Sequence, residues 1–172
     1  MKQPNKVGGG ARTNKVGLHF EQTISLRTVF DEHPDFTVKD DKVYQKGKEI
    51  GLLCGKADIY KKVLAPRGVN YQDYVSKRLY PDDAILINKT VYIIEKKFQS
   101  GAGSVDEKLQ TCDFKKKQYS KLFSAARLKV EYIYVLNDWF KQDCYKDVHE
   151  YILSVGCKYY FLEIPLACLG LE

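Results

Sequence analysis

Residues 81–98, PDDAILINKTVYIIEKKF, constrain the fold of this chain more than any other stretch. Two runs of β-forming residues are separated by Asn88 and Lys89, a pattern typical of a β-hairpin with a two-residue turn. The second run continues directly into the charged residues 95–97. Charged groups inside a strand cost free energy unless they are paired, solvated in a cleft or bound to a metal ion. The stretch therefore predicts a hairpin whose open end holds chemically active side chains.

The register of this hairpin decides which carboxylate lies opposite Glu95. If the two-residue turn forms, Ile87 pairs with Thr90, and the same register places Asp82 opposite Glu95. Directly opposed residues have Cβ atoms about 5 Å apart, so one cation can lie between their carboxylates. A three-residue loop or a bulge would instead make Asp83 the partner, because a one-residue slip turns every side chain to the other face. We predict Asp82 as the ligand and keep Asp83 as the alternative.

Side chains alternate along a strand, so Glu95 and Lys97 share one face of the hairpin while Lys96 takes the other. Two carboxylates with room for water suit Mg²⁺, which keeps several of its waters. A lysine one pleat further along can hold a metal-bound water or offset charge that develops on a phosphate. The arrangement predicts metal-assisted hydrolysis of a phosphodiester. The alternative is an exposed, non-catalytic strand end with a Pro-Asp-Asp turn opposite it.

Pro81 and Asp82, followed by Glu95-x-Lys97, resemble the motif of the PD-(D/E)XK nucleases, the restriction-endonuclease-like superfamily. Residues 95–119, EKKFQSGAGSVDEKLQTCDFKKKQY, also resemble small type II restriction endonucleases. The resemblance covers residues 17–172, and its specific motif is four residues long. It implies an α/β fold with a restriction-endonuclease-like core, in which helices flank a mixed β-sheet with a central hairpin. It also implies that double-stranded DNA is cut to leave a 5′-phosphate and a 3′-hydroxyl.

The same resemblance implies roles for individual residues. Asp82 (or Asp83) and Glu95 would ligate Mg²⁺, with Mn²⁺ able to substitute, and Lys97 would position or help deprotonate the attacking water. Family members commonly place a further glutamate on the first helix, and Glu21 matches that role; an ordinary exposed helical acid is the alternative.

Other polar residues are candidates for contacts with DNA. Gln99 follows the motif on the face of Lys97 and either touches the phosphate or caps the sheet edge. Lys116 interrupts the apolar stripe of a long helix, so it either snorkels or reaches the DNA backbone. The remaining candidates are cations of that helix and of the N-terminal arm: Lys115, Lys117, Arg12 and Lys15.

The order of the expected elements favours one α/β domain over residues 17–172, after a flexible basic arm at 1–16. A helix is expected at 18–33. Strand signals follow, and then come the hairpin and a helix that begins at a capping box formed by Ser104 and Glu107. The alternation of strand and helix at the end of the chain predicts parallel pairing. The expected ranges are strands at 36–38, 42–45 and within 49–64, helices at 104–128 and 138–156, and strands at 130–137 and 158–164.

The net charge of +6 is distributed unevenly along the chain. Residues 89–129 hold ten Lys or Arg against four Asp or Glu, and residues 1–17 hold four cations and no acid. Clustered positive charge favours a polyanionic partner. The five cysteines form no CxxC pair and the three histidines lack metal-ligand spacing, which argues against zinc sites and disulfide frameworks. The N-terminus is too polar for a signal peptide and no run approaches about 18 apolar residues, so we expect a cytoplasmic protein with no membrane partner.

Three functions stay open from the sequence. The first is a Mg²⁺-dependent DNA endonuclease, specifically a type II restriction endonuclease or a subunit of one. One copy has one active site, so a double-strand cut needs a homodimer or a heterodimer with a second nuclease subunit. The second function is a Holliday-junction resolvase or DNA-repair nuclease, which has the same core. The third is a non-catalytic nucleic-acid-binding module, and the intact Glu95 and Lys97 argue against it.

Overall fold

The computed structural model describes residues 17–21 and 24–171. Its centre is a mixed seven-stranded sheet in the order β2-β3-β4-β5-β6-β7-β8. A second sheet pairs the short strands β1 and β9. The expected α/β class with a mixed sheet is confirmed. In chain order the strands are β1 Gly17–His19, β2 Phe36–Lys39, β3 Lys42–Gln45, β4 Lys48–Leu53, β5 Asp83–Ile87, β6 Thr90–Lys97, β7 Lys129–Leu136, β8 Lys158–Phe161 and β9 Glu163–Pro165.

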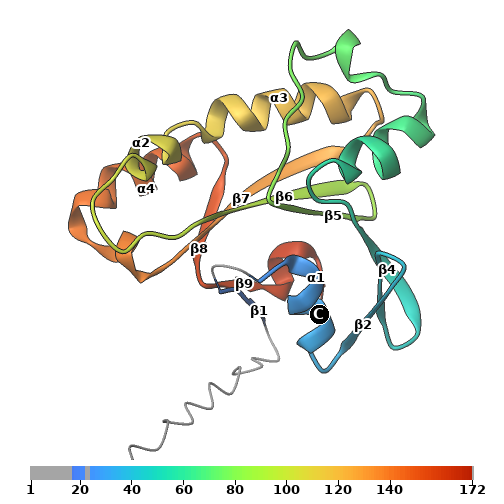
Figure 1. The fold of residues 1–172 in the computed structure, drawn as a ribbon, viewed down its shortest axis with the longest axis horizontal. Helices are drawn as coiled ribbons and strands as arrows, with labels where there is room; N and C mark the ends of the chain where they lie inside the picture. Colours follow the sequence, from blue (N-terminus) through green and yellow to red (C-terminus); the bar gives the residue numbers. More distant parts are fainter. Residues whose placement is uncertain (1–16, 22–23, 172) are drawn as a thin grey trace, which may run out of the picture.

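Helices cover both faces of the large sheet. α2, α3 and α4 lie over one face, and α1 lies against the other face together with β1 and β9 (Figure 1). Shorter π or 3-10 segments join these elements. The helical segments are α1 Leu26–Glu32, η1 Ile59–Leu64, η2 Ala65–Arg67, η3 Tyr71–Asp73, α2 Val105–Leu109, α3 Cys112–Ser124, η4 Asp138–Lys141, η5 Asp143–Tyr145, α4 Lys146–Ser154 and η6 Leu166–Leu169.

Each face of the sheet has its own apolar core. Ile93 packs in the core under α3, where Phe123 is also buried, while its neighbour Ile94 packs in the core that holds Phe30 of α1. The central strands are therefore buried on both faces, which is why β6 and β7 are almost continuously apolar. The charged end of β6 is the exception to this pattern.

The predicted hairpin is confirmed, including its register. Ile87 pairs with Thr90 and Asp83 pairs with Ile94, so the turn consists of two residues. Asn88 in this turn has φ 53°, a left-handed conformation that asparagine adopts more readily than most residues. The predicted parallel pairing is also confirmed, because β6, β7 and β8 run parallel and α3 and α4 make the crossovers between them.

The helix expected at 18–33 is wrong over its first half. Residues 17–19 form β1, in which Leu18 pairs with Ile164, and the Phe20 N–H donates to the Leu162 carbonyl. α1 begins only after Ser25, whose Oγ accepts the Thr28 N–H and caps the helix. A partner about 145 residues along the chain thus supplies backbone hydrogen bonds that the local pattern assigned to a helix.

Other element boundaries also differ from the expectation. Residues 59–64 are helical rather than extended, and the long helix expected at 104–128 is split into α2 and α3. Ser104 does precede α2, but its side chain makes no capping hydrogen bond, so the capping box is absent. The strand expected at 158–164 is divided at Leu162, which has φ 58° and turns the chain from β8 to β9.

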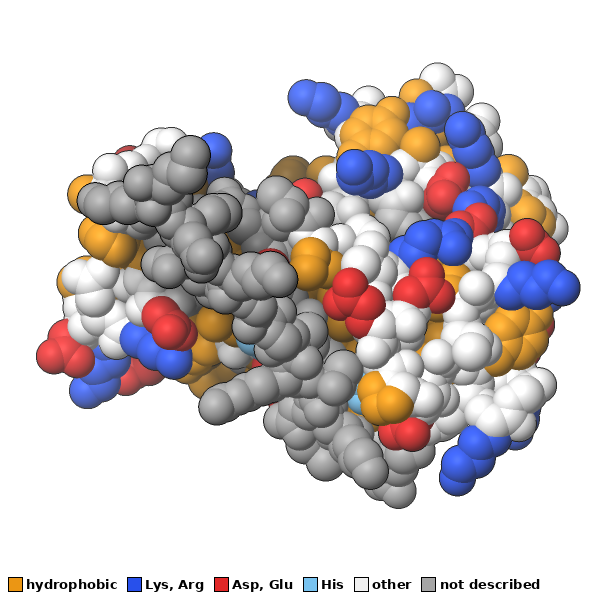
Figure 2. Space-filling model, turned by 60° about the horizontal axis from the view of Figure 1, so that its bottom comes forward, with side chains coloured by type: hydrophobic (Ala, Val, Ile, Leu, Met, Phe, Trp, Pro, Cys, Tyr) orange, Lys and Arg blue, Asp and Glu red, His pale blue; other side chains and the backbone are white. Residues whose placement is uncertain are grey.

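The surface on the α1 side has mixed charge. Figure 2 brings the bottom of Figure 1 forward and shows Lys or Arg side chains interspersed with Asp or Glu over the right-hand part of this face. Within the described part of the chain, no helix combines the length and the apolar character needed to cross a bilayer.

Candidate active site

The hairpin brings Asp82 and Glu95 together at its open end. Asp82 directly precedes β5, and its Oδ2 accepts the Lys96 backbone N–H at 2.9 Å. The charge of Asp82 also contributes to raising the pKa of Glu95, which places the two carboxylates within electrostatic reach of each other. The predicted opposition of Asp82 and Glu95 is therefore consistent with the observed register.

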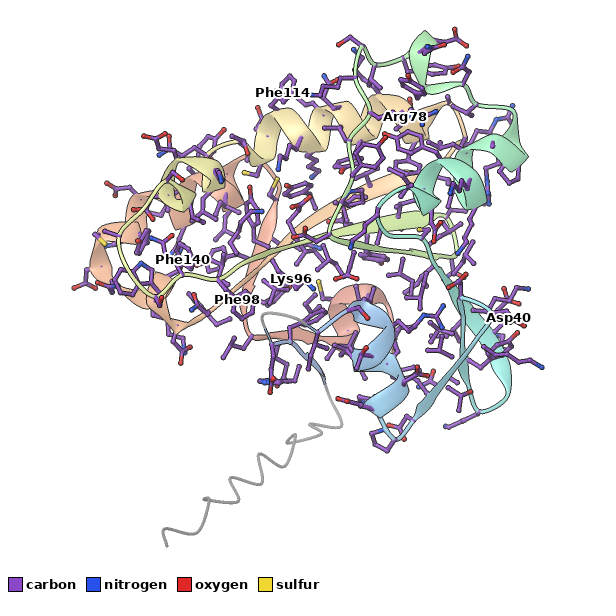
Figure 3. All side chains as sticks on the ribbon, viewed as in Figure 1. Asp40, Arg78, Lys96, Phe98, Phe114 and Phe140 are labelled. Atoms are coloured by element: carbon purple, nitrogen blue, oxygen red, sulfur yellow. The ribbon has the colours of Figure 1, made fainter. Side chains whose placement is uncertain are left out.

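Asp83 and Lys96 lie on the opposite face of the sheet, as the register predicts. The Lys96 Nζ lies 3.1 Å from Asp83 Oδ2 and donates to the Ile24 carbonyl at 2.6 Å. Asp83 Oδ1 accepts the Leu26 N–H at 3.0 Å. Figure 3 shows Lys96 at the centre of the molecule, on the α1 side of the sheet. These contacts fasten the start of α1 to the hairpin, so the geometry supports Asp82 as the candidate ligand and gives Asp83 structural partners.

Glu95 and Lys97 form a largely buried ion pair on the face under α3. The Lys97 Nζ lies 3.3 Å from Glu95 Oε2, and the side chains are 16% and 7% exposed. Burial is the main cause that raises the pKa of Glu95 above its usual value, and the positive charges of Lys97 and Lys115 oppose this shift. Burial therefore disfavours the charged form of Glu95, and a bound cation would favour it.

α3 contributes Lys115 and Tyr119 to the same surroundings. Lys115 was expected on a solvated or DNA-facing surface, but it is half-buried and close enough to Glu95 to lower its pKa. Tyr119 is buried, and its own pKa is raised first by burial and then by the charge of Glu95. The sequence pattern assigned Tyr119 to the apolar stripe alone. The sequence signal that could have assigned Tyr119 to this site is its spacing of four residues from Lys115, which places both side chains on one face of the helix.

The donor atoms at this site fit a hard divalent cation. Asp82 and Glu95 offer carboxylate oxygens, and Mg²⁺ is held in proteins by one or two carboxylates while water completes its coordination. No cluster of three or more His, Cys, Asp or Glu side chains suited to a metal ion exists among residues 17–21 and 24–171. A cation at this place would therefore have two carboxylate ligands from the described residues.

Gln99 is bonded to Asn137 at the end of β7 and contacts Asp106 of α2. Its backbone N–H donates to Asn137 Oδ1 at 3.1 Å, and its carbonyl accepts from Asn137 Nδ2 at 2.7 Å. Its side chain reaches Asp106, with 3.4 Å between Nε2 and Oδ1. Gln99 thus joins the ends of β6 and β7, and its contact with the phosphate or water stays a prediction.

Lys116 and Lys117 have interaction partners other than Glu95. The Lys116 Nζ donates to the Gly156 carbonyl just beyond the end of α4, which makes it a structural contact. Lys117 is 71% exposed and forms an ion pair of 2.8 Å with Asp113 on its own helix. A role in DNA binding stays a prediction for both residues.

The placement of Glu21 on the first helix is wrong. Glu21 is an exposed residue between β1 and α1, because the helix starts at Leu26. Glu21 therefore does not occupy the helical position from which the additional acid of the family is expected to act. Arg12 and Lys15, the candidate contacts on the N-terminal arm, lie outside the described residues.

The raised pKa of Glu95 predicts how stability depends on pH in the metal-free protein. The folded state binds a proton at Glu95 more readily than the unfolded chain, so this stabilisation is present at low pH and is lost as pH rises through the folded-state pKa. Glu95→Gln removes the charge, so its stability relative to the wild type should increase from pH 4.5 to neutral pH.

Urea unfolding in EDTA measures this difference. Glu131→Gln, which removes a carboxylate of β7 paired with Lys158, is the control. A difference between Glu95→Gln and wild type that stays constant or shrinks with rising pH would contradict the prediction.

Comparison of the chain with protein-family models, curated proteins and solved structures finds no match. The function of the protein is therefore inferred from the residues of this site and from their geometry.

Proposed function

We propose that this protein is a metal-dependent endodeoxyribonuclease that hydrolyses phosphodiester bonds in double-stranded DNA with Mg²⁺, or with Mn²⁺ in its place. The observation that supports this proposal is the position of Asp82, Glu95 and Lys97 at one end of the hairpin. Lys97 lies 3.3 Å from Glu95, and the charge of Asp82 acts on the same carboxylate. Two acids and a lysine in this arrangement suit phosphodiester chemistry better than a purely structural role, because burial makes them costly to fold.

In the proposed mechanism, Asp82 and Glu95 would hold the cation through their carboxylates. When bound, the cation would supply Lewis acidity toward the phosphate and lower the pKa of a bound water. The ammonium group of Lys97 positions the attacking water and offsets negative charge on the phosphate. Lys115 adds positive charge from α3 at the same place. The products would carry a 5′-phosphate and a 3′-hydroxyl, as the family resemblance implies.

A type II restriction endonuclease, or one subunit of it, is the biological role that we favour. Each chain offers one hairpin site, so two chains would cut the two strands, either as a homodimer or as a heterodimer with a second nuclease subunit. The resolvase or repair role requires the same chemistry on a branched or damaged substrate. The substrate therefore separates these roles, while the site residues do not.

Incubation of supercoiled plasmid with the purified protein tests the proposal. We expect nicked and linear products in Mg²⁺ or Mn²⁺ and intact plasmid in EDTA, because the two carboxylates need a cation. Run-off sequencing of the products then identifies the role. Discrete sites indicate a restriction enzyme, and cleavage that requires a branched substrate indicates a resolvase. Binding of DNA without any metal-dependent cleavage would contradict the proposal and indicate a binding module.

A further inference from the structure

A cavity of about 200 Å³ lies beside Asp82, between the start of α1, the end of β4 and the start of β5. Both Asp82 and Asp83 line it, so it adjoins the candidate active site. Its lining also includes charged residues from three other segments: Arg27, Asp41, Lys56 and Asp58. Four aspartates and two cations therefore line the cavity, so a charged ligand there meets side chains of both signs.

Most of these charges already have partners. Asp41 is bonded to Arg27 and to Lys62, and Lys62 is also 2.8 Å from Asp58. Asp83 is paired with Lys96. Lys56 is exposed, and its side chain makes no ion pair or hydrogen bond with residues 17–21 or 24–171. The cavity thus contains a lysine whose charge is available to an anion.

The backbone at Lys56 is held against the Pro-Asp turn. The Lys56 N–H donates to the Pro81 carbonyl at 2.9 Å. A Cβ atom on the preceding residue, Gly55, would lie 3.1 Å from the Asp83 Cα, so the two backbones are in close contact. Lys56 itself has φ 54°, in the left-handed region where glycine is strongly favoured over lysine. A lysine in this conformation is a local cost to folding, and Lys46 with φ 51° bears the same cost, so the position of Lys56 beside Asp82 is what distinguishes it.

We propose that Lys56 binds a backbone phosphate of DNA next to the scissile phosphate, which a cation ligated by Asp82 and Glu95 would bind. The inference rests on the proposed nuclease function and adds a contact for the substrate backbone. The charges on the visible α1 side of the molecule are mixed (Figure 2), so a phosphate on that side depends on individual cations rather than on a continuous basic patch. The left-handed backbone at Lys56 fixes the point from which its side chain extends. The hydrogen bond from the Lys56 N–H to the Pro81 carbonyl holds this point beside Asp82.

Lys56→Gly removes the ammonium group but keeps a residue that can adopt the left-handed backbone conformation, so it tests the charge alone. Glycine adopts the left-handed conformation without the steric cost of a Cβ atom, so we expect an unchanged or higher melting temperature. Loss of one phosphate contact should weaken DNA binding and reduce the slope of log Kd against log salt concentration by about 0.9. Lys46→Gly is the matched control, because Lys46 is an exposed lysine with φ 51° in the β3–β4 turn. Lys56→Arg keeps the charge and should keep the salt dependence of the wild type.

The measurement uses a short DNA duplex in EDTA for binding and plasmid in Mg²⁺ for cleavage. A reduced salt slope in Lys56→Gly alone, with a preserved melting temperature, supports the inference. An effect equal to that of Lys46→Gly overturns it, and so does a lower melting temperature, which would give Lys56 a structural role among the aspartates. If the wild type cuts no DNA, both the proposed function and this inference fail; if it cuts and Lys56→Gly binds normally, only the inference fails.

Discussion

Glu95→Gln and Lys97→Ala are each expected to lower Mg²⁺-dependent DNA cleavage by a factor of about 10³ or more. Glu95→Gln leaves the shape of the side chain almost unchanged but removes the negative charge that would hold the cation. Lys97→Ala removes the ammonium group that lies 3.3 Å from Glu95 and would face the attacking water. Single-turnover cleavage of plasmid measures both effects.

Both variants should remain folded and should still bind DNA, although Lys97→Ala leaves Glu95 without its ion pair and should lower the free energy of unfolding. Gel shifts in EDTA and circular dichroism check these points. Lys61→Ala is the control for a lysine removed elsewhere, since Lys61 is exposed and lies on η1. Cleavage within a factor of about ten of wild type by either site variant would refute the assignment of this pair.

Asp82→Asn and Asp83→Asn are expected to have opposite effects, although the residues are adjacent. Asp82→Asn should abolish cleavage and leave stability nearly unchanged, because its side-chain oxygen can still accept the Lys96 N–H. Asp83→Asn should retain cleavage but reduce the free energy of unfolding by about 3 kcal/mol, since it leaves the Lys96 charge without its partner. We expect the low end of the range for buried pairs because Lys96 and Asp83 are 15% and 13% exposed. Urea unfolding and plasmid cleavage below the unfolding transition measure the two properties.

The double variant Asp83→Asn with Lys96→Met provides the control. Removing both partners also removes the unpaired charge, so it should recover part of the stability lost in Asp83→Asn. An inactive Asp83→Asn beside an active Asp82→Asn would mean that the ligand lies on the α1 face. That outcome would move the candidate site to the other side of the sheet.

The contrast between these neighbours follows from the hairpin, and the sequence was sufficient to predict it. A two-residue turn at Asn88 sets the register, and alternation along the strand then assigns every side chain to a face. Both rules involve residues that are close in the chain. The parallel order of β6, β7 and β8 was predictable for a related reason, because a helix between two strands returns the chain in the same direction.

Contacts between distant segments could not be predicted in this way. Lys96 bonds to Ile24, and Lys116 bonds to Gly156, so both lysines make structural contacts with segments that are remote in the sequence. Lys115, one residue before Lys116, lies close enough to Glu95 for its charge to lower the pKa of that carboxyl. Neighbouring lysines in a charge run look alike in sequence, and their roles depend on which remote element packs against each of them.

The N-terminal region shows the same limit for secondary structure. Residues 18–33 have a helical pattern, yet Leu18 pairs with Ile164 and only residues from Leu26 onward form the helix. The hairpin, its register and the shared face of Glu95 and Lys97 were predictable from residues close in the chain, because turn geometry and side-chain alternation are local. The tertiary structure decided where Glu21 lies, that Asp83 binds α1 and that Lys56 adjoins Asp82, because these depend on pairings between segments far apart in the chain.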